Sequence, residues 1–165
     1  MAMIFRRLRH VTMLVAFFAP SLCHSQTTEP QKLVTIQEYI SANSSSLSDP
    51  PTFQYVLVRC TALYNALSAR FNRETAPGRL AIQSQLNSKA ADFFSYSFNL
   101  EKTQLDNKGD NIANMKANII KLAVIYDANM SDASLRLGSF WNNEIVKSDY
   151  DTCEGLLTYV KSRSK

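Results

Sequence analysis

Histidine, the side chain that most often serves in acid–base catalysis and in transition-metal sites, occurs in this sequence only as His10 and His24. Both residues precede Ser25, after which we expect an N-terminal leader to be removed. The remaining chain would then have no imidazole for a Ser-His-Asp or Cys-His mechanism, and none for a His-rich metal site. The sequence therefore predicts no catalytic residues, no metal site and no cofactor.

Two cysteines, Cys60 and Cys153, remain once the leader and its Cys23 are removed. An exported protein enters an oxidising compartment, where paired cysteines usually form a structural disulfide. Their wide separation in sequence excludes a local C-x-x-C redox pair, and two thiolates are too few for a structural zinc site. We therefore expect a Cys60–Cys153 disulfide, which in the chain-entropy model stabilises the fold by about 4–5 kcal/mol. The alternative is two unrelated buried thiols.

Aromatic residues gather in two stretches of the sequence and are the candidates for a binding surface. The first stretch runs from Phe93 to Phe98, and the second includes Phe140 and Trp141. Successive aromatics on one helix spread over too wide an arc to face a single core, and an exposed aromatic patch is typical of a partner or ligand site. The candidates for that patch are Tyr96, Phe98, Phe140 and Trp141. The alternative interpretation places these side chains in the core.

Asp149, Asp151 and Glu154 form the densest acidic group in the sequence. Paired carboxylates carry out acid–base chemistry when their surroundings separate their pKa values. We expect a helix to begin near Ser148, however, and acidic residues are favoured in the first turn of any helix. The simpler interpretation is that these three residues stabilise a helix N-terminus.

The first 25 residues have the order of segments that is typical of a secretory signal peptide. Arg6, Arg7 and Arg9 precede an apolar stretch over 11–19, which is too short to span a membrane, and Pro20 follows it. The leader carries three of the 18 basic residues and none of the 14 acidic ones, so its removal lowers the net charge from +4 to +1. We expect a periplasmic or secreted protein that has no transmembrane segment after cleavage. We also expect it not to bind nucleic acid, which requires clustered basic residues.

Apolar residues after position 34 recur at steps of three and four, which is the period of an α-helix. Thr35 with Glu38 forms a capping box, and Asp49 precedes two prolines, so both mark helix starts. The expected helices cover 35–43, 50–71, 79–105, 110 to 137 or 141 depending on Gly138, and a last segment from about 148, with a tight turn at 106–109. The predicted fold is an all-α, up-and-down bundle of four to five helices with one disulfide. Residues 35–165 would form its single domain, after a disordered lead-in over 26–34.

The run from Tyr55 to Tyr64, YVLVRCTALY, together with Cys153-Glu154, resembles small exported bacterial proteins of unassigned function. The resemblance covers one helix and the second cysteine. It implies a helical exported domain with paired cysteines, and it implies no activity and no site residues.

The absence of catalytic parts in a disulfide-closed bundle favours an exported, non-enzymatic binding module with a protein partner. An accessory subunit, an inhibitor and an immunity-type protein all fit this description. The alternative is a carrier that holds a small apolar ligand between its helices. A third hypothesis is an enzyme that uses only carboxylate, Lys, Tyr or Ser side chains, with Asp149, Asp151 and Glu154 as its candidates.

Overall fold

The computed structural model describes residues 33–43, 47–73, 75, 77–104 and 110–163. The expected signal peptide over 1–25, the lead-in as far as residue 32 and the turn expected at 106–109 lie outside these residues. Within the described residues the structure is all-α and has no strand, which confirms the predicted fold class. Its elements are α1 (Ile36–Ala42), α2 (Pro50–Asn72), α3 (Arg79–Gln104), α4 (Asp110–Leu137), a short 3-10 helix η1 (Phe140–Asn142) and α5 (Glu144–Arg163).

Both predicted helix starts carry the expected side-chain caps. At α1, the backbone N–H of Thr35 donates to Glu38 Oε2 at 2.7 Å, and the backbone N–H of Glu38 donates to Thr35 Oγ1 at 3.1 Å. At α2, Asp49 Oδ2 accepts from the backbone N–H of Thr52 at 3.0 Å, and prolines occupy the first two helical positions. These caps satisfy backbone donors that have no partner within the first turn of a helix.

The C-terminal part of the chain begins its last helix earlier than the sequence suggests. Gly138 has a φ of 75°, a left-handed conformation that ends α4 and leads into η1. Asn143 then caps α5, since its Oδ1 accepts from the backbone N–H of Val146 at 3.0 Å. The prediction that this helix begins near Ser148 is therefore wrong, because an asparagine cap five residues earlier starts it. Asp149 consequently lies in the second turn, where the helix-dipole interpretation does not apply to it.

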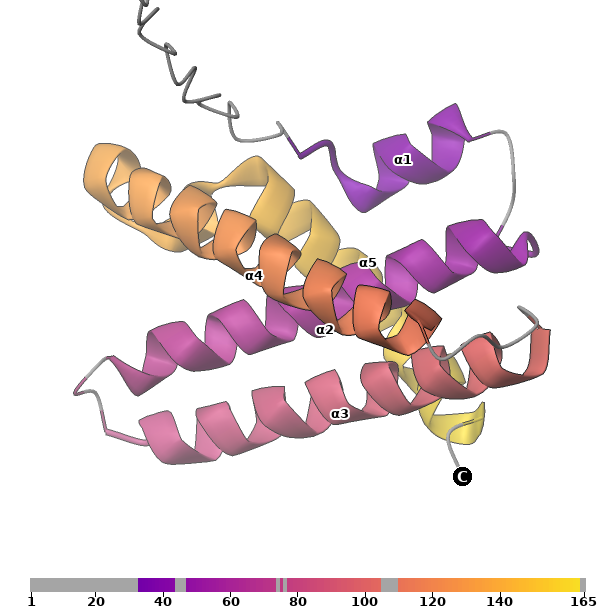
Figure 1. Cartoon of the computed structure of the whole chain (residues 1–165). Coiled ribbons are helices and arrows are strands. Elements are labelled where there is room, and N and C mark those ends of the chain that lie inside the picture. Colours follow the sequence, from indigo (N-terminus) through magenta and orange to yellow (C-terminus); the bar gives the residue numbers. More distant parts are fainter. Residues whose placement is uncertain (1–32, 44–46, 74, 76, 105–109, 164–165) are drawn as a thin grey trace, which may run out of the picture.

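The four long helices alternate in direction, and α2 is the central one (Figure 1). α2 and α3 run side by side, joined through the left-handed Gly78, while α4 and α5 both cross α2. α1, α3, α4 and α5 all contact α2. This position explains why α2 buries residues on nearly every side, a pattern typical of a helix enclosed by others.

The predicted disulfide between Cys60 and Cys153 is confirmed. The two Cα atoms are 5.6 Å apart, both residues are fully buried, and the bond joins the middle of α2 to the middle of α5. The C-terminal helix is thereby fixed covalently to the centre of the bundle.

Candidate functional site

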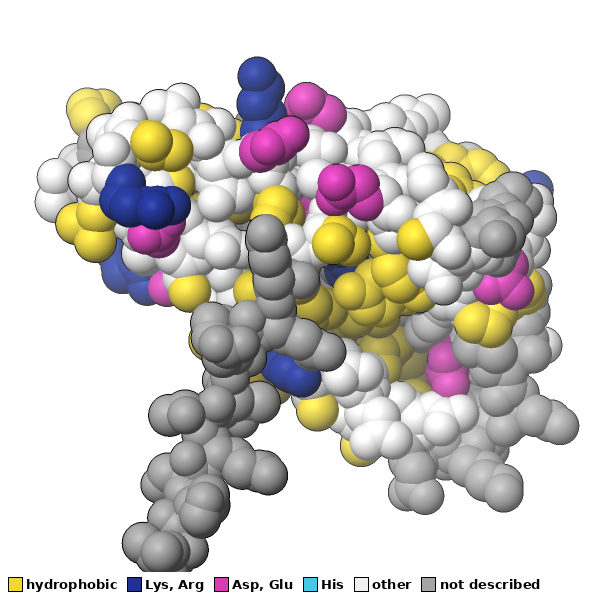
Figure 2. Space-filling view, turned by 90° about the horizontal axis from the view of Figure 1, so that it is seen from above, with side chains coloured by type: hydrophobic (Ala, Val, Ile, Leu, Met, Phe, Trp, Pro, Cys, Tyr) yellow, Lys and Arg dark blue, Asp and Glu magenta, His cyan; other side chains and the backbone are white. Residues whose placement is uncertain are grey.

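A groove of about 690 Å³ lies between the first half of α2 and the first half of α4. Figure 2 shows it as a hollow with a hydrophobic floor. One end is formed by the segment that enters α1, and the other by the end of α3. The apolar lining residues are Leu33, Val34, Pro51, Tyr55, Val58, Met115, Leu122 and Ile125.

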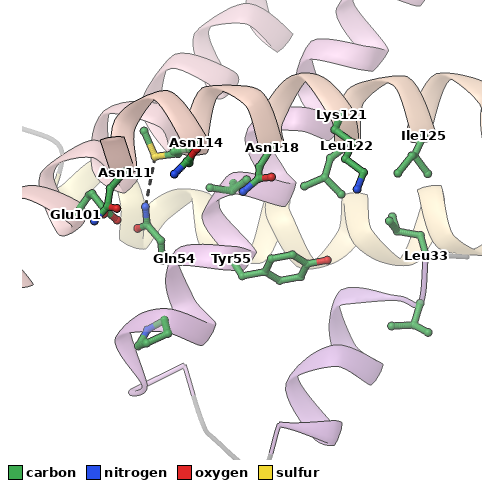
Figure 3. Close-up of a pocket in the computed structure, with 14 residues that line it drawn as sticks. Leu33, Gln54, Tyr55, Glu101, Asn111, Asn114, Asn118, Lys121, Leu122 and Ile125 are labelled. Carbon is green, nitrogen blue, oxygen red and sulfur yellow. Dashed lines mark hydrogen bonds between the residues drawn. The ribbon is translucent and has the colours of Figure 1, made fainter. Parts of the chain in front are cut away.

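One wall of the groove is a row of amide side chains on α4. Asn111, Asn114 and Asn118 follow one another at steps of three and four, and Lys121 continues the row. Residues at this spacing share one helix face, and the three asparagines span about 10 Å along the axis. Figure 3 shows them opposite Gln54 and Tyr55 of α2.

Two further polar side chains in the groove lack a good partner. The Gln54 Nε2 group donates only to the thioether Sδ of Met115, at 3.4 Å, which is a weak acceptor, and Gln54 Oε1 is buried without any hydrogen bond. Glu101 is only 6% exposed, and no described residue hydrogen-bonds to its carboxylate or forms an ion pair with it. A buried polar atom without a partner costs about 1–3 kcal/mol, and Gln54 Oε1 is such an atom.

Behind the groove lies a buried ionic cluster in which every polar group is satisfied. Arg59 and Asp149 form an ion pair with neither side chain exposed, and the Tyr126 hydroxyl, also fully buried, donates to the same carboxylate. Arg59 Nε donates to the Tyr126 hydroxyl at 3.1 Å. Burial raises the pKa of Tyr126 well above 10, and it also raises the pKa of Asp149, against the opposing effect of the Arg59 guanidinium. Arg59, Tyr126 and Asp149 are called the buried ionic cluster below.

The buried ionic cluster also holds the end of the groove in place. Arg59 Nη1 donates to the backbone carbonyl of Val34 at 2.8 Å, and Asp149 Oδ1 accepts from the backbone N–H of Ile36 at 2.6 Å. Leu33 is 9% exposed and belongs to the core. The expected disordered lead-in over 26–34 therefore does not extend to its last two residues, because this cluster fixes their backbone.

A second polar cluster joins α2, α3 and α5 on another side of the bundle. Glu154 Oε1 accepts from the Tyr64 hydroxyl at 2.6 Å and from Lys89 Nζ at 2.5 Å. The ammonium of Lys89 also lies over the rings of Tyr64 and Tyr150, 5.5 and 5.6 Å from their centroids. Burial alone would raise the pKa of Glu154, but Lys89 and Tyr64 outweigh burial and lower it below its ordinary value.

The three predicted acidic candidates are thus separated by the structure. Asp149 belongs to the buried ionic cluster, Glu154 binds Lys89 and Tyr64, and Asp151 is exposed. Two of the three carboxylates are consequently engaged in contacts between helices. Asp149 and Glu154 therefore connect helices of the fold.

The structure separates the four aromatic candidates. Near the start of α2, the ring of Tyr96 packs on Phe53, 5.8 Å between centroids, whereas Phe98 pairs with Phe94 of the same helix, α3, at 6.4 Å. Near the end of α2, Phe140 packs on Phe71 and Trp141 lies 5.2 Å from Tyr150. Tyr96, Phe98 and Phe140 are half-buried, whereas Trp141 is 37% exposed.

These aromatic residues do not form a single patch and do not line the groove. Phe53 and Phe71 are 18 residues apart on one helix, which corresponds to about 27 Å along the axis. Binding at any of these aromatic residues remains a prediction.

The asparagine row is the feature of the groove that the sequence analysis missed, although its spacing was visible in the sequence. Asparagine is a poor helix former, up to about 0.7 kcal/mol less favourable than alanine in a helix interior. Three asparagines on one face of one helix therefore lower the stability of that helix at three positions. A search for polar side chains at helical spacing, in addition to apolar ones, would have found them.

The fold and the groove define this chain as a disulfide-linked, all-helical protein with an amide-lined apolar groove. Comparison with protein-family models, with curated proteins and with solved structures finds no match in any of the three. The described residues contain no group of three or more His, Cys, Asp or Glu side chains placed to hold a metal ion. None of the described helices combines the length and the apolarity needed to cross a membrane.

Proposed function

We propose that the protein is an exported, non-enzymatic binding module that holds a segment of a partner protein in the groove between α2 and α4. The observation that carries this proposal is the groove itself, with its apolar floor and its wall of amides. Its volume of about 690 Å³ falls within the range of about 300–1,000 Å³ typical of ligand sites.

Export is the second part of the proposal, and it is supported by the sequence and by the disulfide. The first 25 residues have the order of a signal peptide, and a Cys60–Cys153 bond is stable in an oxidising compartment. We propose a periplasmic or secreted location on these grounds. An accessory, inhibitory or immunity-type role all remain compatible with a groove that holds a partner.

The decisive experiment places a photo-crosslinking amino acid at Tyr55, inside the groove, in cells that export the protein. We expect it to capture a partner protein, and we expect Asn118→Trp, which fills the groove from α4, to abolish the capture. The matched control is a crosslinker at Asn65, which is exposed on α2 outside the groove. A partner captured equally at both positions, or retained after Asn118→Trp, would contradict the proposal.

The alternative function is a carrier of a small apolar ligand, and the apolar floor of the groove favours it. Native mass spectrometry of the exported protein distinguishes the two functions. A carrier would retain a bound small molecule that disappears in Asn118→Trp, whereas a partner-binding module would show the mass of the chain alone.

A further inference from the structure

We infer that the groove binds an extended polypeptide segment carrying a Lys or Arg side chain, with its peptide groups on Gln54, Asn114 and Asn118 and its basic group beside Glu101. The inference rests on the proposed function, because it names the class of ligand that the groove takes.

The asparagine row matches the hydrogen-bonding pattern of an extended backbone. A carboxamide offers both N–H donors and a carbonyl acceptor, which is the complement of a peptide group. The steps from Asn111 to Asn114 and from Asn114 to Asn118 advance about 4.5 and 6 Å along α4. An extended chain repeats every second residue at about 6.6–6.8 Å. A segment lying along α4 therefore meets the successive asparagines with peptide groups one to two residues apart.

The floor of the groove suits the side chains of such a segment. Alternate residues of an extended chain point to the same side, so every second side chain would face the apolar floor. Tyr55 and Val58 on α2 and Met115 and Leu122 on α4 provide that floor. We therefore expect the bound segment to alternate apolar residues with residues that face solvent.

Gln54 and Glu101 restrict the chemical class of the ligand more than the shape of the groove does. Gln54 Oε1 requires an N–H donor, which a peptide bond supplies and a hydrocarbon chain does not. Glu101 is an acidic residue of the groove lining without a hydrogen-bond or ion-pair partner among the described residues, so charge complementarity favours a cation beside it. Figure 3 places Glu101 beyond Asn111 and Asn114, so the basic residue of the ligand lies at that end of the row. A purely apolar ligand would leave Gln54 Oε1 without a hydrogen bond and would offer no counter-charge to Glu101.

The test uses the disulfide-bonded exported protein and a library of capped hexapeptides, each containing one lysine at a varied position. We expect the selected peptides to alternate apolar residues and to share one lysine position. Norleucine at that position should weaken binding to the wild-type protein. In Glu101→Gln, which removes the charge and keeps the shape, lysine and norleucine peptides should bind equally.

Asparagine variants test the recognition of the backbone. The double variant Asn114→Ala/Asn118→Ala should bind the selected peptide at least about tenfold more weakly, because two or more hydrogen bonds are lost. Asn65→Ala, a matched asparagine on an exposed helical position outside the groove, should bind it as the wild type does. A peptide with N-methylated peptide bonds should fail to bind.

Three results would overturn the inference. The first result is undiminished binding of the N-methylated peptide to the wild-type protein, or of the selected peptide to the double asparagine variant. Either would show that the backbone is not recognised. Dodecanoate that binds in the groove independently of the asparagines would identify an apolar carrier. A dimer in sedimentation that Asn118→Trp disrupts would show that a second copy of the chain occupies the groove. The first and the third result leave the binding of a polypeptide in the groove in place, whereas the dodecanoate result would replace the proposed function by the alternative of an apolar carrier. The absence of any occupant under all these conditions would remove both functions.

Discussion

The buried ionic cluster and the groove lie close together on α2, yet they differ in whether their polar side chains have hydrogen-bond partners. In the cluster, Arg59 and Asp149 are fully buried, and each has both a side-chain and a backbone partner. In the groove, the carbonyl oxygen of Gln54 is buried without a hydrogen bond, and Glu101 has no partner among the described residues. The first arrangement connects four elements of the fold, and the second offers groups that a ligand would satisfy under the proposed function.

Under the proposed function, this difference separates residues that stabilise the bundle from residues that bind the partner. Substitutions in the buried ionic cluster should lower the free energy of unfolding, whereas substitutions in the groove should leave it unchanged or raise it. Substitutions in the groove should weaken ligand binding more than substitutions in the buried ionic cluster do.

The largest expected effect is the loss of stability in Asp149→Ala. Removing this carboxylate leaves the Arg59 guanidinium buried without a counter-charge, which typically costs about 3–5 kcal/mol. Urea unfolding followed by circular dichroism measures the change. A loss below about 1 kcal/mol would show that the ion pair is not a main support of the fold.

A double replacement sharpens that result. Arg59→Met/Asp149→Leu removes both charges and keeps much of the volume, so it should cost less than Asp149→Ala alone. If the double replacement costs more than the single one, hydrogen bonds to the α1 entry segment contribute more than the charge pair does.

The next effect in size is the removal of the disulfide. Cys60→Ala/Cys153→Ala should lower the free energy of unfolding by about 2–5 kcal/mol, mainly because the unfolded chain gains freedom. Urea unfolding of the wild type in the presence of a reductant should show a similar loss of unfolding free energy. Unfolding that is insensitive to reductant would contradict a stabilising role for the bond.

A gain in stability is expected in the groove. Asn114→Ala/Asn118→Ala should raise the free energy of unfolding by up to about 1 kcal/mol, because alanine is the better helix former at both positions. Thermal unfolding measures the difference. Asn65→Ala is the control, because it gives the stability change for the same replacement on another exposed helical face. A clear loss of stability in the double variant would assign the asparagines to the fold and not to binding.

The smallest effect is a pH dependence that originates at Glu154. The Lys89 ammonium and the Tyr64 hydroxyl hold the pKa of this carboxylate below 4.5 in the folded protein. A lowered folded pKa contributes stability above the unfolded value, and that contribution is lost as the pH falls through the folded value. Unfolding of Glu154→Gln between about pH 3 and 6 should therefore depend less on pH than that of the wild type. Parallel pH profiles would exclude Glu154 as the source.

The helices and the disulfide followed from local features of the sequence. The apolar spacing, the Thr35–Glu38 capping box and the prolines after Asp49 each act within a few residues, so they can be recognised without the fold. The pairing of the two cysteines followed from their number alone. The start of α5 was missed because the cap at Asn143 lies directly after the 3-10 turn, and because the buried Asp149 interrupts the apolar stripe between Val146 and Cys153.

The contents of the site depended on tertiary contacts. Arg59 and Asp149 lie on helices that meet only in the folded bundle, so neither position indicates its partner in sequence. The unsatisfied state of Gln54 and Glu101 likewise depends on which neighbours are absent around them. The asparagine row was recognisable in principle, since its members are only three and four residues apart on α4.

The most direct test of the account is an NMR titration of the 15N-labelled protein with the selected peptide, in which the side-chain amide signals are observed. We predict that the signals of Gln54, Asn114 and Asn118 shift together as the peptide is added, while that of Asn65 stays in place. Peptide binding that moves the signals of Leu122 and Met115 but leaves these three amides unchanged would contradict the claim that the groove recognises a polypeptide backbone.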